Sequence, residues 1–284
     1  MRKFRTDLAE EAVSTRKAES LDGVVVNESC KKGFRLYDVK IETVEASGVL
    51  DKPMGRYLTF SLYNGYKNKP NGFSDAIAVL SEAISGFIPE EGDVLIAGLG
   101  NAAITPDSVG PEALQSIVVT RHLKKSLPDD FSSLRSVAAV APGVLGETGI
   151  ESADILRGVF REISPSLLII IDALAAESAS RLLSTIQITD TGLVPGSGIG
   201  NARAKLTPAA LGVPVIAIGV PTVIYADTLL KEADRTVTSP FGDLIVTPKE
   251  IDSAVKEIAK IIGYSLDLAL FEGMTIEEAA HYLA

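Results

Sequence analysis

Short, nearly uncharged apolar runs alternate with amphipathic stretches along most of this chain, and that alternation restricts its fold more than any other feature. The runs have the length and composition of strands that are buried on both faces of a sheet. They lie at 93–99, 116–121, 137–140, 167–171 and 214–218, and the intervening helical patterns lie at 74–87, after Pro106 and at 152–163. We therefore expect an α/β fold with a mostly parallel sheet flanked by helices on both faces.

The flanking segments predict additions to this sheet. Phe34 to Val44 and Arg56 to Leu62 alternate apolar and polar residues, which predicts two half-exposed strands in an antiparallel edge pair. Residues 1–33 are polar with little apolar periodicity, so we expect a partly irregular N-terminal arm. Thr247-Pro-Lys-Glu250 is a capping-box sequence that predicts a helix to about Leu270. Without a repeat or a linker, residues 1–284 are expected to form a single domain.

Composition limits the possible partners. The net charge of −10 argues against direct binding of nucleic acid, which needs a basic surface. Cys30 is the only cysteine, so an intrachain disulfide is excluded and a structural or surface thiol is expected. The longest uncharged apolar stretch, 213–226, contains two prolines and is too short to cross a bilayer. Because the N-terminus is charged and lacks a signal-peptide core, we expect a cytoplasmic protein without a membrane partner.

Two aspartates follow apolar runs and are the candidate catalytic residues. Asp107 lies in the loop after the strand at 93–99, and Asp172 directly follows the strand at 167–171. Both are expected at the carboxyl edge of the sheet, where α/β proteins place their sites. Amides and a helix dipole would favour the ionised form of Asp107, whereas apolar neighbours would raise the pKa of Asp172. In this hypothesis Asp107 is the base that activates water and Asp172 is its protonated partner.

Each aspartate also has a purely structural interpretation. Thr105 could cap a helix that has Pro106 at its first position, with Asp107 in the first turn. Thr207-Pro208 has the same pattern without any sign of chemistry. Asp172 could cap a helix that follows its strand. Local sequence leaves both interpretations open.

The remaining motifs carry weaker signals. Gly98-Leu-Gly-Asn101 suggests dinucleotide binding, but residue 103 is alanine where a third glycine would be needed. The glycine-rich stretch from Gly192 to Arg203 predicts either a ligand-binding loop or a long connection. His122, at the end of an expected strand, is interpreted as structural, and His281 as a surface residue. With two histidines and one cysteine, a metal site would have to be built mainly from carboxylates, so neither metal nor cofactor is expected.

Several segments together resemble one known family, the germination proteases of spore-forming bacteria. The resemblance covers residue 5 to beyond residue 250. The matching segments are Arg5-Thr-Asp-Leu-Ala9, Gly98-Leu-Gly-Asn101, Thr105-Pro-Asp-Ser-Val-Gly-Pro111, Thr120-Arg-His-Leu123, Ala141-Pro-Gly-Val144, Ile171-Asp-Ala-Leu-Ala175, Pro195-Gly-Ser-Gly-Ile-Gly-Asn201, Val237-Thr-Ser-Pro-Phe-Gly-Asp243 and Val246-Thr-Pro248.

The resemblance implies an endopeptidase that degrades small acid-soluble spore proteins in the spore core during germination. It implies an atypical aspartic mechanism whose two essential residues correspond to Asp107 and Asp172. It further implies a fold similar to hydrogenase-maturation endopeptidases, a homotetramer, and synthesis as a zymogen whose propeptide precedes the Arg5 segment. Only Met1 to Phe4 precede Arg5 here, so either activation differs or the chain corresponds to a processed form.

Two other functions remain as alternatives. One is a metal-dependent endopeptidase of the hydrogenase-maturation type. The other is a non-enzymatic protein that binds a nucleotide or a peptide through the Gly98 region and the Gly192–Gly200 loop.

Overall fold

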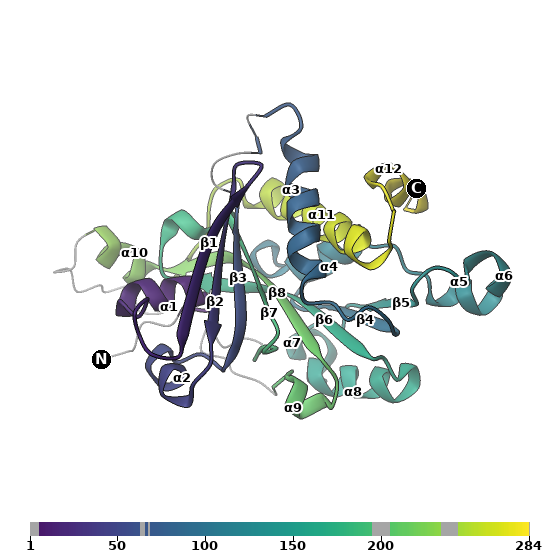
Figure 1. Cartoon of the computed structure of the whole chain (residues 1–284), viewed down its shortest axis with the longest axis horizontal. Coiled ribbons are helices and arrows are strands. Elements are labelled where there is room, and N and C mark those ends of the chain that lie inside the picture. The colour runs from purple at the N-terminus through teal and green to yellow at the C-terminus, as the bar shows by residue number, and fades with distance from the viewer. Residues whose placement is uncertain (1–5, 63–65, 68, 195–204, 234–243, 284) are drawn as a thin grey trace.

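A nine-stranded mixed sheet forms the middle layer of the protein (Figure 1), seen here in a computed structural model. The structure describes residues 6–62, 66–67, 69–194, 205–233 and 244–283. The strands are β1 (Val24–Lys31), β2 (Phe34–Ile41), β3 (Gly55–Ser61), β4 (Val94–Gly98), β5 (Val137–Val140), β6 (Leu167–Ala176), β7 (Thr185–Thr189), β8 (Val215–Tyr225) and β9 (Ile245–Val246). The helices are α1 (Ala9–Arg16), α2 (Val44–Leu50), α3 (Gly72–Ser85), η1 (Thr105–Asp107), α4 (Val109–Leu114), α5 (Arg121–Ser126), α6 (Pro128–Phe131), α7 (Leu145–Thr148), α8 (Ser152–Ile163), η2 (Ala179–Arg181), α9 (Pro208–Leu211), α10 (Ala226–Ala233), α11 (Ile251–Leu270) and α12 (Ile276–Tyr282).

The sheet has a parallel part and an antiparallel part. Its strand order is β1-β2-β3-β7-β8-β6-β4-β5, and β9 pairs with β8. Strands β5, β4, β6 and β8 pair in parallel, whereas β1, β2, β3 and β7 continue the sheet from β8 by antiparallel pairing. The expected α/β class, flanking helices and added edge strands are confirmed, but the antiparallel part is larger than the expected pair of strands.

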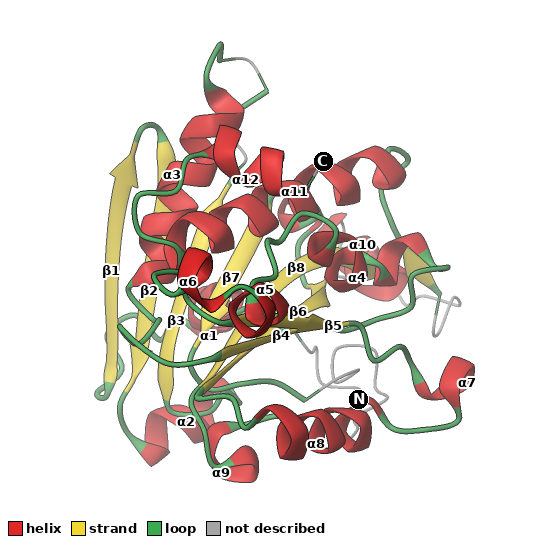
Figure 2. Ribbon diagram, turned by 90° about the vertical axis from the view of Figure 1, so that its right-hand side faces the viewer, coloured by secondary structure: helices red, strands yellow, loops and turns green. Residues whose placement is uncertain are grey.

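Helices cover both faces of this sheet, as Figure 2 shows. On one face α3, α4 and α11 pack over the middle strands and bury the largest apolar cluster. On the other face α8 covers Leu95, Leu168 and Val215, while α1 lies against β2 and β3. Where β4 and β6 pair with each other, over 94–98 and 167–171, both strands are apolar because neither of their faces meets water.

The described part of the N-terminal arm, residues 6–33, contains a helix and a strand, which partners distant in sequence hold in place. Residues 9–16 form α1 although its apolar periodicity is weak, and β1 adds an outer strand to the sheet. Glu10 is 2% exposed, and Oε1 of its carboxylate pairs with Arg35 and Arg181, both at 2.5 Å. Strand β1 exposes most of its residues, which explains its polar sequence.

Two other predictions were wrong for tertiary reasons. The stretch 116–121 is not a strand: it runs into α5, with the Thr120 hydroxyl accepting from Val137 N–H at 3.0 Å. Helix α11 begins at Ile251 rather than at Pro248, the first helical position that the capping-box sequence predicts, although it ends at Leu270 as expected. Thr247 instead donates its hydroxyl hydrogen to the carbonyl of Thr222 at 2.9 Å. No helix within the described ranges is both long enough and apolar enough to cross a membrane.

One carboxyl group is enclosed in the core and gives the fold a pH dependence. Asp267 on α11 is fully buried, and its Oδ1 accepts from Val118 N–H at 2.9 Å. Burial raises the pKa of Asp267 to about 7. Since this pKa is above that of the unfolded chain, the folded protein holds the proton more tightly, and the free energy of unfolding decreases as pH rises from about 4 to about 7.

Replacing Asp267 with asparagine should remove this dependence. Asp267→Asn keeps an acceptor for Val118 N–H and carries no charge, so the variant should match the wild type near pH 4. At pH 8 it should be more stable by up to about 4 kcal/mol, which corresponds to roughly three pKa units. Urea unfolding at several pH values measures the effect. Asp252→Asn, at an exposed position of the same helix, is the matched control, and equal pH dependence in all three proteins would contradict the prediction.

Candidate functional site

Asp172 lies inside a strand rather than at its end. Strand β6 continues to Ala176, so the expected strand-to-helix turn, and with it the helix-cap interpretation, is wrong. The neighbouring strand β4 stops earlier, with Gly98 opposite Ile171. Asp172 is therefore the first β6 residue beyond the carboxyl end of β4. Its Oδ1 accepts from Ala173 N–H at 2.9 Å, and the residue is 8% exposed.

Asp107 comes from the loop that follows β4. It ends the short turn η1, and its N–H donates to the Ile104 carbonyl at 2.7 Å. Its Oδ2 accepts from Asn101 N–H at 2.8 Å, so the loop folds back on its own carboxylate. Thr105 does not cap this turn with its side chain, whereas Thr207 does cap α9 in the expected way. Asp107 is half-buried.

Glycines bring this loop against the sheet. A Cβ on Gly110 would lie 2.3 Å from the Leu99 carbonyl oxygen and 2.6 Å from that of Ile171. A Cβ on Gly98 would lie 2.4 Å from the Gly110 carbonyl oxygen. Gly100 has φ +111°, and a Cβ there would meet the Asp107 carbonyl oxygen. The Gly98-Leu-Gly motif thus has a packing role that explains it without a dinucleotide: it lets α4 and the Asp107 turn approach the ends of β4 and β6.

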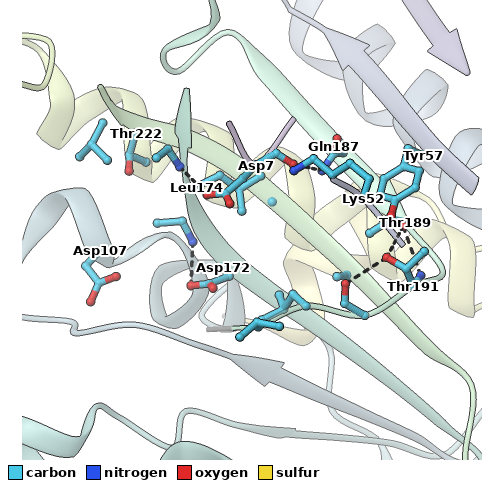
Figure 3. Close-up of a pocket in the computed structure, with 18 of the residues that line it drawn as sticks. Asp7, Lys52, Tyr57, Asp107, Asp172, Leu174, Gln187, Thr189, Thr191 and Thr222 are labelled. Carbon is cyan, nitrogen blue, oxygen red and sulfur yellow. Dashed lines mark hydrogen bonds between the residues drawn. The ribbon is translucent and has the colours of Figure 1, made fainter. Parts of the chain in front are cut away.

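Both aspartates line one cavity of about 640 Å³ (Figure 3). Asp107 enters it from the loop after β4, and Asp172 from β6. Ile104 and Ile245 also line it although they are 53% and 41% exposed, so its mouth is partly apolar. The structure therefore brings together the two carboxylates that the sequence singled out.

The N-terminal segment supplies a third carboxylate to this cavity. Asp7 N–H donates to the Ala175 carbonyl at 3.2 Å, and Asp7 Oδ2 accepts from Ala175 N–H at 3.0 Å. Gln187 accepts from Ala9 N–H at 2.7 Å and donates to the Asp7 carbonyl at 3.1 Å. Asp7 thus bonds to β6 at Ala175, beyond the point where β4 ends. Its place in the Arg5–Ala9 segment was the only sequence signal for it.

Lys52 and Tyr57 form another part of the wall, and no sequence pattern had indicated either residue. The Lys52 ammonium donates to the Thr6 carbonyl at 2.6 Å, which ties the N-terminal segment to the loop after α2. Burial lowers the pKa of Lys52, while the nearby carboxylates of Asp7 and Asp51 oppose that shift. Burial raises the pKa of Tyr57, whose hydroxyl donates to the Pro53 carbonyl at 2.8 Å. Lys52 therefore brings a hydrogen-bond donor into a cavity whose other ionisable groups are mainly carboxylates.

Of the other candidate residues, some belong to the glycine-rich loop beside the cavity and the others are exposed elsewhere on the surface. Gly192 lines the cavity, and Leu193 and Leu206 join the two ends of its loop by paired backbone bonds of 3.0 and 2.9 Å. The centre of that loop, 195–204, and the 237–243 segment lie outside the described residues. His122 on α5 and His281 on α12 are exposed, and Cys30 is an exposed thiol on β1. Within the described part of the chain, no group of three or more His, Cys, Asp and Glu side chains is arranged to hold a metal ion.

Fold and site together define an α/β protein with an acidic cavity at the carboxyl edge of its parallel strands. Residues 4–242 match the sequence model of the germination proteases. The chain belongs to the germination protease family and is thus a protease that acts on a protein substrate.

Curated relatives match along nearly their whole length. The germination protease of Caldanaerobacter subterraneus subsp. tengcongensis is 41% identical, over 97% of this chain and 96% of the relative. The germination proteases of Clostridium perfringens and Bacillus subtilis are 37% and 35% identical; the alignments cover 100% and 98% of this chain and 100% and 96% of the relatives. Among solved structures, the NiFe hydrogenase maturation protease HycI from Thermococcus kodakarensis overlaps 65% of this chain and 98% of its own, with 17% identity and a TM-score of 0.37.

The glycine contact between α4 and the sheet can be tested by a matched pair of substitutions. Gly110→Ala should lower the free energy of unfolding by about 3 kcal/mol, because its methyl group would meet rigid backbone. It should also reduce proteolytic activity by displacing the Asp107 turn. Gly158→Ala is the control: Gly158 lies within α8 with open space around it, so this change should be neutral or stabilise by up to about 1 kcal/mol. Urea unfolding of both variants is the measurement, and equal stability would contradict the packing argument.

Proposed function

We propose that this protease hydrolyses small acid-soluble spore proteins during germination, with Asp107 and Asp172 as an acid/base pair. The observation that supports it most is that both carboxylates line one cavity at the carboxyl edge of the sheet. Two carboxyl groups around one cavity can divide the work of activating water and protonating the leaving amine. Membership of the germination protease family supports the substrate.

The surroundings of the two groups support different roles. Each carboxylate accepts a backbone amide hydrogen bond, Asp107 from Asn101 and Asp172 from Ala173, so exposure is what separates them. Asp107 is half-buried, which suits an ionised base that removes a proton from water. Asp172 is 8% exposed and directly follows the fully buried Ile171 in β6, which suits a group that holds its proton and then donates it. Lys52 supplies a hydrogen-bond donor within the same cavity.

A peptide bond can reach this site only in an extended or locally unfolded chain. The cavity lies at the edge of the sheet, and Ile104 and Ile245 give its mouth an apolar surface for the side chains beside the scissile bond. The compartment that we propose is the cytoplasm of the forespore and the spore core.

On the family resemblance we further propose synthesis as a zymogen. We also propose assembly as a homotetramer, and sedimentation of the purified protein tests that assembly.

Single substitutions test the catalytic pair. Asp107→Asn and Asp172→Asn should each reduce kcat for cleavage of a small acid-soluble spore protein by about 10²–10⁴-fold, because each removes a proton-transfer group and little volume. Both variants should retain the wild-type melting temperature within a few degrees. Gel-based and mass-spectrometric analysis of the fragments measures the loss.

Asp129→Asn, at an exposed position on α6, is the control and should cleave normally. Undiminished cleavage by either pocket variant would remove that aspartate from the mechanism. Intact substrate with the wild-type protein under activating conditions would instead contradict the proposed substrate.

Metal removal separates this proposal from the metal-dependent alternative. Because the proposed chemistry uses only carboxylates, a chelator should leave kcat unchanged and added nickel should not increase it. Loss of activity with the chelator, restored by one metal ion, would favour the hydrogenase-maturation type of mechanism.

A further inference from the structure

A bulge in β8 lies next to the two aspartates. In the pairing of β6 with β8, Leu174 is opposite Pro221 while Ala175 is opposite Val223, so Thr222 is an extra residue in β8. Thr222 is fully buried and lines the cavity. Bulges commonly occur beside active sites, where they redirect a side chain.

The bulge directs the Thr222 hydroxyl to the turn that carries Asp107. Thr222 Oγ1 donates to the carbonyl of Pro106 at 2.6 Å, one residue before Asp107. Thr247 in turn donates to the Thr222 carbonyl at 2.9 Å, and β9 just before Thr247 pairs with β8. Two threonines thus connect strands β8 and β9 to the Asp107 turn.

This connection spans the two halves of the proposed catalytic pair. Asp172 lies opposite Gly219 in the neighbouring strand β8, three residues before the bulge. Bonds within the loop, from Asn101 to the carboxylate and from Asp107 N–H to Ile104, set the shape of the loop. Those bonds do not set the distance of the turn from β6, whereas the bond from Thr222 fixes the turn to the strand beside Asp172.

We propose that Thr222 is a positioning residue that, through the Pro106 carbonyl, holds the Asp107 carboxylate in register with Asp172. The inference rests on the proposed catalytic roles of the two aspartates. A displacement of about 1 Å at a catalytic group can cost roughly 10²-fold in rate. Loss of one buried hydrogen bond at this point is therefore enough to lower kcat.

Thr222→Val tests this, because valine keeps the branched shape and lacks the hydroxyl group. We expect kcat on a small acid-soluble spore protein to fall at least about 10-fold with KM changed less than about 2-fold, as for an interaction that acts on the chemical step. The acid limb of the pH–kcat profile should also move to higher pH, because a displaced Asp107 loses the amide hydrogen bond from Asn101 that favours its ionised form. Thr222→Ser, which restores the hydroxyl, should return both kcat and the acid limb close to the wild type.

Thr185→Val is the matched control, since Thr185 is a fully buried threonine on β7 whose hydroxyl has no hydrogen-bond partner among the described residues. It should leave kcat and the acid limb unchanged. If Thr222→Val does not fold, Thr247→Val removes the second bond of the chain and should move the same two quantities in the same direction by a smaller amount.

Wild-type kcat and an unmoved acid limb in Thr222→Val, or in Thr247→Val where only that variant folds, would overturn the inference. So would Thr222→Ser behaving like Thr222→Val. The proposed catalytic pair fails separately, through full activity of Asp107→Asn or Asp172→Asn.

Discussion

The site depends on one packing constraint. Where α4 crosses the ends of β4 and β6, the backbones are in direct contact, with no side chain between them. At Gly98 and Gly110 there is no room for a side chain between the helix and the strands. The chain can therefore turn from β4 into η1 and α4 within a short distance, and Asp107 stays close to the strand that carries Asp172. Any larger residue at these points would push α4 away from the strands and separate the two acids.

Buried charged groups, as well as apolar residues such as Ala12 and Val13, dock the N-terminal segment onto this core. Burial raises the pKa of Glu11, although it accepts amide bonds from Glu177 and Ser178 and a hydroxyl bond from Thr6. Glu10 pairs with arginines from β2 and from the turn after β6. Such groups are costly to bury and become favourable only when all their partners are in place, so the segment should dock in one register or not at all.

Sequence reasoning succeeded where local pattern and tertiary environment agree. Strands β4 and β5, helix α8 and the end of α11 follow their apolar periodicity, because each buries the face that the period defines. It failed for α1 and β1, whose order comes from arginines and strands elsewhere in the chain, and for 116–121, where the apolar residues pack on α11 without pairing as a strand. For the site, two aspartates were foreseeable from their position after buried runs. Lys52 was not, because a lysine after a short helix becomes part of a wall only through the fold.

The walls of the cavity come from residues as distant as Asp7 and Thr247. The bond between Asp7 and Ala175 alone joins positions 168 residues apart, and β8 and Thr247 follow later still. During synthesis from the N-terminus, the segment that carries Asp7 must wait for most of the chain before its partners exist. The cavity is therefore among the last features to assemble. An unfinished chain emerging from the ribosome already carries Asp107 and the N-terminal segment, but the site to which they belong has not yet formed.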